Sequence, residues 1–520
     1  MNNSTRSLAQ SFAIGLLLLA ALAMGGCSTN PVTKKSELSW MSEEQEIRLG
    51  TQQYLQNQQS AGGRFLLDPA LSAYVNDVGQ KLVRVSDRPS LPFEFVVIND
   101  SVPNAWALPG GKLAVNRGLL TELKSEAELA AVLSHEIVHA AARHGAGAME
   151  RGMLLSAGAA IISVLGSENR NAGLIDFAAA GGAGLLSARF GREHELEADH
   201  YGIDYMVRAG YDPKAAVELH ETFVRLSGGK DAGWLTGMFA THPPSQERVN
   251  ANRARAGSQP ANLYRGEDVY RQKTAFLRAS KPAYAAHDEG RKALEKEPAR
   301  ALAQAERAIV LEPREAMFYA LRGDALKKLG RTAEAEHEYG EAIKRNGDYY
   351  AFYLNRGLTR QRLGNQAGAQ SDLERSNALL PTAAAHFVLG HLAQSANNPE
   401  RAIEHFRVAA GSDSDVGRRA GESLTRLDLP RNPGNYVEVQ AVADGNGNLG
   451  LRVTNCSPVA LRNLRVAGAV QQLNFYREYF VPGPLAPGQS TVVVMGVRLP
   501  DFSAAPNRVS AQVRGADPAQ

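Results

Sequence analysis

Apolar residues recur at helical spacing through most of the first half of the 520-residue chain. One β-like insert interrupts this pattern: apolar positions alternate by two from Phe93 to Ile98 and again from Lys112 to Asn116. Pro109-Gly110-Gly111 directly precedes the second run and predicts a turn. We therefore expect a mainly helical domain over residues 43–256 that contains a small antiparallel sheet.

Glycines and aromatic residues then repeat along the chain with a nearly constant period. Gly323, Gly357 and Gly390 are 34 and 33 residues apart. This period, with alanines and aromatic residues at matching positions, resembles tetratricopeptide repeats, in which each unit is a pair of helices. We expect about four units over residues 281–425, forming an α-solenoid after a linker at residues 257–280.

Alternation by two returns after Leu429, in runs such as YVEVQAVA, LGLRVTN and STVVVMGVRL. Asp-Gly, Asn-Gly, Ser-Pro and Pro-Gly pairs separate the runs and predict turns. About six short strands over residues 430–520 are typical of a small β-sandwich. The predicted fold class is therefore multidomain α+β, with a helical domain that holds a small sheet, an α-solenoid and a C-terminal β-sandwich.

The first residues are typical of a secretory signal. The apolar run Phe12–Met24 is too short to span a bilayer but fits a signal-peptide core over residues 1–26. The small residues before Cys27 resemble a bacterial lipobox, which implies a lipidated Cys27, and Ser28 resembles lipoproteins sorted to the outer membrane. Residues 27–42 would then be a polar tether to the membrane. The alternative is a soluble secreted protein that is cleaved nearby.

The composition excludes some partners. Basic and acidic residues are nearly balanced, at 57 and 54, and the net charge is +3. No basic stripe is apparent in the sequence, so we do not expect nucleic-acid binding. With only Cys27 and Cys456, no disulfide framework can be read from the sequence. If Cys27 carries lipid, we expect Cys456 to be a small, buried hydrophobic residue.

The stretch ELAAVLSHEIVHAAARHG reads as a helix that is apolar on nearly every side, yet it contains His135, Glu136 and His139. Residues four apart project from one face of a helix, so the two imidazoles can converge on one metal ion. Glu136 flanks that face, where its carboxylate can reach a water molecule at the metal. The alternative of two surface histidines is disfavoured by the apolar neighbours Leu133 and Ile137. The H-E-x-x-H pattern in this setting predicts a buried, metal-bearing helix.

A catalytic metal needs a third protein ligand. Zinc proteases with H-E-x-x-H-x-x-G-x-x-H are excluded, because Ala142 and Gly145 stand where that pattern needs glycine and histidine. His144 lies about 140° round the helix from His139, so we expect it to point away from the metal and to be structural.

The later stretch SARFGREHELEADHYGIDYM offers glutamates as the third ligand. Glu195 and Asp199 are four residues apart and share a helix face, so Glu195 could bind the metal while Asp199 orients a histidine ligand. Glu193 and Glu197 have the same spacing, and spacing alone leaves both choices open.

Four separated motifs, NAWALPGGKLAVNRGLL, HEIVHAAARHG, EHELEADHYG and THPPSQERV, occur in order. Together they resemble the M48 family of gluzincin metallopeptidases, and in particular its periplasmic lipoprotein branch with tetratricopeptide repeats. The resemblance implies a zincin-type peptidase domain with one Zn²⁺ per chain held by His135, His139 and Glu195. It also implies that Glu136 is the general base and that Asp199 orients a ligand without binding the metal itself.

The same resemblance assigns roles to residues around the metal. An edge strand near Asn104, Ala105 and Trp106 would pair with an extended substrate. His242 either is a loop histidine before two prolines or occupies the open zinc position and keeps the enzyme inactive. Arg248 would either polarise the substrate carbonyl or serve as a helix cap or salt-bridge residue.

The function implied is that of a zinc-dependent endopeptidase that hydrolyses unfolded or misassembled envelope proteins in periplasmic and outer-membrane quality control. Its implied partners are unfolded protein substrates, the outer-membrane β-barrel assembly machinery through the repeats, and the membrane through the lipid anchor. An alternative of another class is a tetratricopeptide-repeat chaperone or scaffold lipoprotein that aids outer-membrane protein assembly with little proteolysis. The intact H-E-x-x-H and E-x-x-x-D patterns argue against a dead enzyme.

Overall fold

A computed structural model describes residues 27–153, 190–227, 241–444, 446–498 and 509–519. The chain divides into two compact units, Met1–Tyr349 and Tyr350–Gln520. The expected signal sequence lies outside the described residues. Of the helices in the described ranges, none is both long and apolar enough to cross a bilayer.

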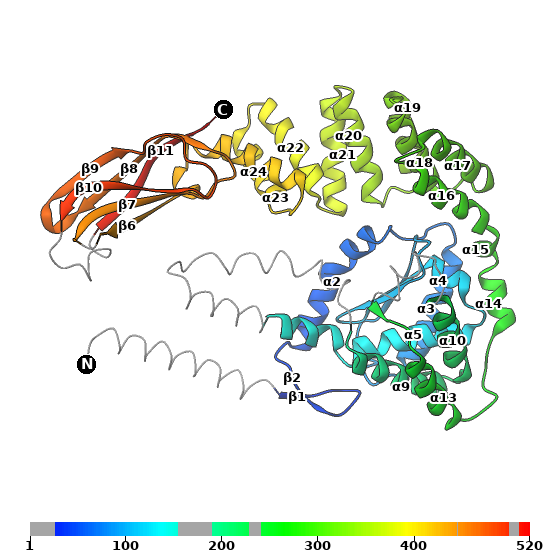
Figure 1. Cartoon of the computed structure of the whole chain (residues 1–520). Helices are drawn as coiled ribbons and strands as arrows, with labels where there is room; N and C mark the ends of the chain where they lie inside the picture. The colour runs from blue at the N-terminus through cyan, green and yellow to red at the C-terminus, as the bar shows by residue number, and fades with distance from the viewer. Residues whose placement is uncertain (1–26, 154–189, 228–240, 445, 499–508, 520) are drawn as a thin grey trace, which may run out of the picture. The chain divides into compact units, whose positions relative to one another are not determined.

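The first unit begins with helices arranged around one small sheet (Figure 1). Its elements up to residue 257 include, in chain order, β1 (Cys27–Thr29), β2 (Ser36–Leu38), α2 (Glu43–Ser60), α3 (Pro69–Val83), β3 (Glu94–Ile98), β4 (Ala105–Leu108), β5 (Lys112–Asn116), α4 (Arg117–Glu122), α5 (Glu126–Ala141), α9 (Arg192–Arg208), α10 (Lys214–Ser227) and α13 (Gln246–Gly257).

The small sheet has the strand order β3-β5-β4. β4 and β5 form the expected antiparallel hairpin, whose turn places Gly110 and Gly111 at φ 74° and 82°. β3, however, pairs with β5 in parallel, so the sheet is mixed and the expectation of a purely antiparallel sheet is wrong for this pair. Every residue of β5 is buried, which favours its central place between two neighbours. β4 is consequently an edge strand.

Helix α5 forms the buried centre of this domain. Ser125 caps its N-terminus, and its Oγ accepts a hydrogen bond from the Glu128 N–H at 3.1 Å. Every residue of the helix is buried, and the helix packs against α3, α9, α10 and β4. The polar side chains in its middle are therefore isolated from bulk solvent.

The segment expected as a tether is folded onto this domain. β1 and β2 form an antiparallel pair in which Cys27 lies opposite Leu38. Val32 is buried, and the Asn30 side-chain amide donates a hydrogen bond to the Ala142 carbonyl at 3.0 Å. The chain directly after Cys27 thus contacts the C-terminal end of α5.

The segment expected as a linker is also packed into the first unit. It contains α14 (Glu267–Lys273) and α15 (Ala275–Ala279). Tyr270 and Leu277 are fully buried in the core, and the Tyr270 hydroxyl donates a hydrogen bond to the Leu120 carbonyl at 2.7 Å.

Helical hairpins follow in both units, as the repeat pattern predicts (Figure 1). The first unit contains α16 (Lys281–Ala293), α17 (Pro298–Leu311), α18 (Ala316–Lys328) and α19 (Thr332–Arg345). The second unit contains α20 (Tyr350–Arg362), α21 (Gln366–Leu379), α22 (Ala383–Ser395), α23 (Pro399–Ala410) and α24 (Asp415–Asp428).

The repeated glycines lie where the two helices of a hairpin touch. A Cβ atom at Gly323 would come within 2.9 Å of the Tyr339 ring, and one at Gly390 within 2.6 Å of the Phe406 ring. At Gly357 the neighbour is Leu373, at 2.9 Å, and since carbon atoms do not pack that closely, each of these positions requires glycine. This contact is the physical basis of the period seen in the sequence.

The C-terminal region is a six-stranded β-sandwich, as predicted. Its sheets have the orders β10-β7-β6 and β11-β8-β9, and both contribute side chains to one core, including Leu451 and Val466. Its elements are η1 (Pro433–Asn435), β6 (Val437–Ala443), β7 (Asn448–Asn455), β8 (Leu461–Val470), η2 (Gln471–Leu473), β9 (Phe475–Phe480), β10 (Ser490–Arg498) and β11 (Val509–Pro518).

Cys456 is exposed, so the expectation that it is buried is wrong. It directly follows β7, in the loop to β8. There the buried side chains are those of its neighbours Asn455 and Ser457, so the side chain between them faces outward.

Candidate metal centre

Four side chains from three parts of the first unit meet at one point. The potential ligand atoms of His135, His139, Glu195 and His242 lie within 4.8 Å of one another, and all four side chains are buried. His135 and His139 come from α5, Glu195 from α9 and His242 from the residues before α13.

The two α5 histidines point their Nε2 atoms toward one another at 3.1 Å. The Glu195 carboxylate lies 3.5 Å from Nε2 of His139 and 3.6 Å from Nε2 of His135. A Cβ atom on Gly202 would stand 3.3 Å from the His135 backbone nitrogen, so the glycine allows α9 to lie close against α5. This close crossing brings Glu195 to the histidines.

The structure places only one of the three candidate glutamates in the cluster. Glu193 is exposed on α9. Glu197 lies at the edge of the site, where its carboxylate is 2.7 Å from Lys35 Nζ and 3.5 Å from His144 Nε2. Glu195 therefore has the position that the family resemblance implies for the third ligand.

Asp199 and Arg248 form a buried pair behind the ligands. Asp199 Oδ1 is 2.9 Å from His135 Nδ1, which orients that ring with Nε2 toward the cluster. The Arg248 guanidinium forms a fork on both oxygens of Asp199, at 2.7 and 2.8 Å, and its Nη1 lies 2.7 Å from Glu195. Of the two roles expected for Arg248, the salt bridge is the one its contacts favour.

Neighbouring positive groups keep the carboxylates of Asp199 and Glu195 charged. Burial raises the pKa of the Asp199 carboxyl, but the Arg248 guanidinium and the His220 ring outweigh it, so the pKa lies well below its ordinary value. Burial also raises the pKa of the Glu195 carboxyl. The neighbouring imidazoles, above all that of His242, outweigh burial, so this pKa too lies well below its ordinary value. Both carboxylates are therefore anionic at neutral pH.

The set of donors fits a zinc ion. Burial lowers the pKa of His139 well below its ordinary value, which keeps the ring neutral and able to bind a metal. Imidazole nitrogens and a carboxylate are the ligands that zinc prefers. Both oxygens of Glu136 are buried and, within the part of the chain that the structure describes, have no hydrogen-bond partner. A buried carboxylate that lacks hydrogen bonds is costly, so this arrangement favours a cation and a water molecule beside it.

His242 closes the cluster on the side of Glu136. Its Nδ1 lies 2.9 Å from Glu195 and 3.3 Å from Nε2 of His135, and its Nε2 lies 3.5 Å from Glu136. Burial lowers the pKa of His242, but Glu136 and Glu195 outweigh it and hold the pKa above its ordinary value. Of the two expectations for this residue, a position inside the site is the one that the structure supports.

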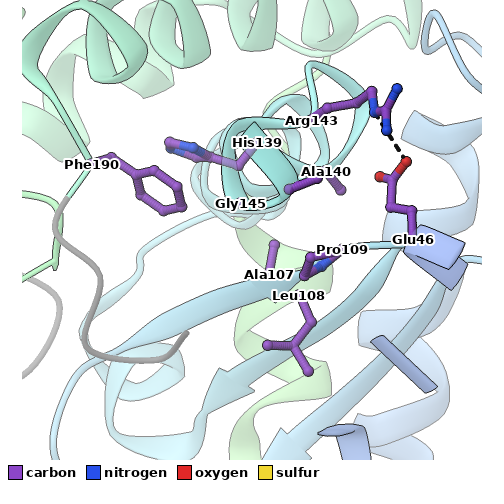
Figure 2. A pocket seen from close by; sticks show the side chains of 10 residues that line it. Glu46, Ala107, Leu108, Pro109, His139, Ala140, Arg143, Gly145 and Phe190 are labelled. Atoms are coloured by element: carbon purple, nitrogen blue, oxygen red, sulfur yellow. Dashed lines mark ion pairs between the residues drawn. The ribbon is translucent and has the colours of Figure 1, made fainter. Parts of the chain in front are cut away.

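The edge strand lies beside the metal ligands. Ala107 and Leu108 of β4 line a cavity of about 10 Å³ together with His139 and Phe190 (Figure 2). The expected strand residues Ala105 and Trp106 are buried, and Trp106 packs edge-on against Tyr54 at 6.2 Å. The end of β4 thus shares a cavity with His139 of the cluster.

Sequence reasoning missed two side chains of the site. The Phe190 ring stacks on His139 with a centroid distance of 4.1 Å, and the position of this aromatic just before the EHELEAD motif was the only available signal. His144 lies outside the ligand cluster, as expected, but the sequence did not indicate that its Nδ1 lies 3.0 Å from Nδ1 of His139, behind the ligand. The helix ends at Ala141 and Arg143 has φ 61°, so the helical angle no longer applies at His144.

Parts of the chain are similar to known proteins. Residues 69–256 match the model of peptidase family M48, and residues 318–349 match the tetratricopeptide repeat. The beta-barrel assembly-enhancing protease of Escherichia coli (strain K12) is 30% identical over 276 residues, which cover 50% of this chain and 55% of that protein.

Two further relatives are similar over shorter stretches. The putative beta-barrel assembly-enhancing protease of Vibrio cholerae is 33% identical over 201 residues, 37% of this chain and 40% of that protein. The mitochondrial metalloendopeptidase OMA1 of Schizosaccharomyces pombe is 34% identical over 222 residues, 42% of this chain and 63% of that protein. The chain spans about half the length of the curated relatives that it matches.

Proposed function

The chain carries a peptidase family M48 domain followed by tetratricopeptide repeats, and on this premise we propose that it is a zinc-dependent endopeptidase. The observation that carries the proposal is the convergence of His135, His139 and Glu195 beside the buried carboxylate of Glu136, which has no hydrogen bond within the described residues. Three ligands and one acid that is not a ligand are the parts that metal-assisted hydrolysis of a peptide bond requires.

In the proposed mechanism His135, His139 and Glu195 hold the zinc. The chemistry that zinc supplies when bound is polarisation of the scissile carbonyl and a lowered pKa of water, to ~7. Glu136 accepts the proton of the attacking water and later delivers it to the leaving amine. Its two oxygens have no competing hydrogen bonds within the described residues, which leaves them free for both transfers.

The remaining buried charges keep the ligands in place. Asp199 holds His135 through its Nδ1 nitrogen, and Arg248 compensates the charge of Asp199 and Glu195. Because Arg248 is occupied by these two carboxylates, we assign it to positioning the ligands and not to the substrate carbonyl.

We further propose that an extended substrate pairs with the free edge of β4. Pairing with an edge strand reads the backbone of the substrate more than its side chains. Such recognition requires a locally unfolded substrate, which suits cleavage of misassembled proteins. The position of Ala107 and Leu108 beside His139 supports this path.

The same site contains a candidate off-switch. His242 lies between Glu136 and Glu195, where the scissile carbonyl must approach. We propose that it competes with the substrate and that the chain must move it aside before cleavage. The contacts of His242 with Glu136 and Glu195 support this proposal.

For the cellular role we propose removal of unfolded or misassembled envelope proteins. The relatives named beta-barrel assembly-enhancing proteases support a role near β-barrel assembly, with the repeats as the surface for a client or for the assembly machinery. A lipid on Cys27 would hold the chain in the periplasm at the outer membrane. The hairpin that begins at Cys27 would then lie at the membrane surface.

The charge-removing but nearly isosteric variant Glu136→Gln tests the proposed mechanism. It should bind zinc like the unmodified chain, while its kcat/KM toward casein, used as an unfolded protein, should fall about 10²- to 10⁴-fold because the proton acceptor is lost. His200→Ala, an exposed histidine on α9, is the matched control and should retain activity. Equal cleavage by Glu136→Gln at equal zinc content would remove Glu136 from the mechanism.

A genetic comparison separates the peptidase from the scaffold alternative. In a strain lacking the protein, Glu136→Gln should fail to restore envelope integrity if proteolysis is the main task. If this variant restores integrity while deletion of the repeats does not, the protein acts mainly as a scaffold.

A further inference from the structure

The two histidines of α5 are held from behind by different chemical groups. His135 Nδ1 faces the Asp199 carboxylate at 2.9 Å, the arrangement common for metal-bound histidines. His139 Nδ1 instead faces a second imidazole, with Nδ1 of His144 at 3.0 Å. His144 is 4% exposed, and nothing in the proposed peptidase mechanism uses it.

The short contact between two ring nitrogens requires one donor and one acceptor. If Nε2 of His139 offers its lone pair to the metal, its proton must be on Nδ1. Nδ1 of His144 must then be the acceptor, so the proton of His144 is on Nε2. That nitrogen lies 3.5 Å from the Glu197 carboxylate, which favours this tautomer.

The ring of His144 is held in place from two further directions. It stacks on the His194 ring with a centroid distance of 4.3 Å and an angle of 21°. The turn that presents it is fixed at Ala142, whose carbonyl accepts a hydrogen bond from Asn30, and at Arg143, whose guanidinium contacts Glu46 at 3.3 Å (Figure 2). The orientation of His144 is therefore determined by tertiary contacts and not by α5.

We propose that His144 is a positioning residue that fixes the tautomer and orientation of His139, with Glu197 fixing His144 in turn. This inference rests on the proposed role of His139 as a zinc ligand. In this arrangement one oxygen of Glu197 lies 3.5 Å from Nε2 of His144, while the other pairs with Lys35 at 2.7 Å. The arrangement also supports His139 with a neutral group, so that no third carboxylate is added beside Glu195 and Asp199.

Two amide substitutions at one position test the hydrogen bond directly. In His144→Asn the side-chain oxygen can replace Nδ1 and accept from His139, whereas in His144→Gln the amide reaches the position of Nε2 and leaves His139 unpartnered. Zinc affinity of the full chain is measured by competition with a chromophoric chelator. Only variants whose metal-free form unfolds at the same midpoint as wild type are compared. We expect the Kd for zinc to rise about 10- to 100-fold for Gln and to stay near wild type for Asn.

A second pair of variants avoids the buried position. Glu197→Ala leaves His144 in place but removes the carboxylate that favours a proton on its Nε2. We therefore expect weaker zinc binding than in the control variant Glu193→Ala, which removes an exposed glutamate of the same helix. Equal affinities for the Asn and Gln variants of His144, or for the two glutamate variants, would overturn the inference. A wild-type chain without measurable zinc affinity would instead overturn the proposed function on which the inference rests.

Discussion

Removing the side chain of His242 should activate the peptidase. The ring is 3% exposed and contacts both the third ligand and the proposed base, with Nδ1 at 2.9 Å from Glu195 and Nε2 at 3.5 Å from Glu136. A hydrogen bond to a charged group contributes about 1.5–3 kcal/mol. If one such bond favours the blocked state, the open state is populated at about one part in 10 to one part in 100. His242→Ala should therefore raise kcat/KM about 10- to 100-fold.

The assay is the initial rate of cleavage of fluorescently quenched casein by the full chain, normalised to its measured zinc content. Normalisation is needed because His242 lies close to the zinc ligands, and a loss of metal would otherwise mimic a loss of activity. His200→Ala serves as the control for removing an imidazole from the surface of the same domain. If His242→Ala at full zinc occupancy cleaves no faster than wild type, the ring does not block the site and the argument from its contacts is refuted.

Four further changes have defined outcomes. Arg248→Met leaves two buried carboxylates without their cation, so urea denaturation of the metal-free chain should show a loss of about 3–5 kcal/mol; a loss near zero would contradict the buried pairing. Gly390→Ala should lower stability by about 1–3 kcal/mol, because its Cβ would lie 2.6 Å from Phe406. Gly421→Ala, whose nearest neighbour atom is 3.6 Å away, should instead raise the unfolding temperature, and the same sign for both variants would refute the packing argument. Chelation of metal should abolish casein cleavage and added Zn²⁺ should restore it, with circular dichroism unchanged; cleavage that survives chelation excludes a metal mechanism.

The repeats and the sandwich were predictable because their signals are local. The period of Gly323, Gly357 and Gly390 reports a contact within one helical hairpin, so it can be read without knowing the rest of the fold. Strand alternation and turn residues likewise depend on near neighbours. The parallel pairing of β3 with β5 could not be read in this way, because it depends on which strand takes the centre of the sheet.

The exposure of Cys456 also could not be predicted from the sequence. Its hydrophobic character favours burial in general. Its actual exposure follows from its place between Asn455 and Ser457, whose side chains turn into the sandwich at the end of β7. Residue type alone does not decide such a position.

The amino-acid sequence was sufficient to place His135 and His139 on one face of a helix, with Glu136 beside them, since four-residue spacing fixes a shared face whatever the helix packs against. It could not choose among three glutamates of a later stretch, because Glu193 and Glu197 have the same spacing as Glu195 and Asp199. The crossing of α9 over α5 made that choice by bringing Glu195 to the two imidazoles. The turn after α5 likewise brought His144 to His139, since a left-handed residue ends the helical geometry from which its direction was inferred.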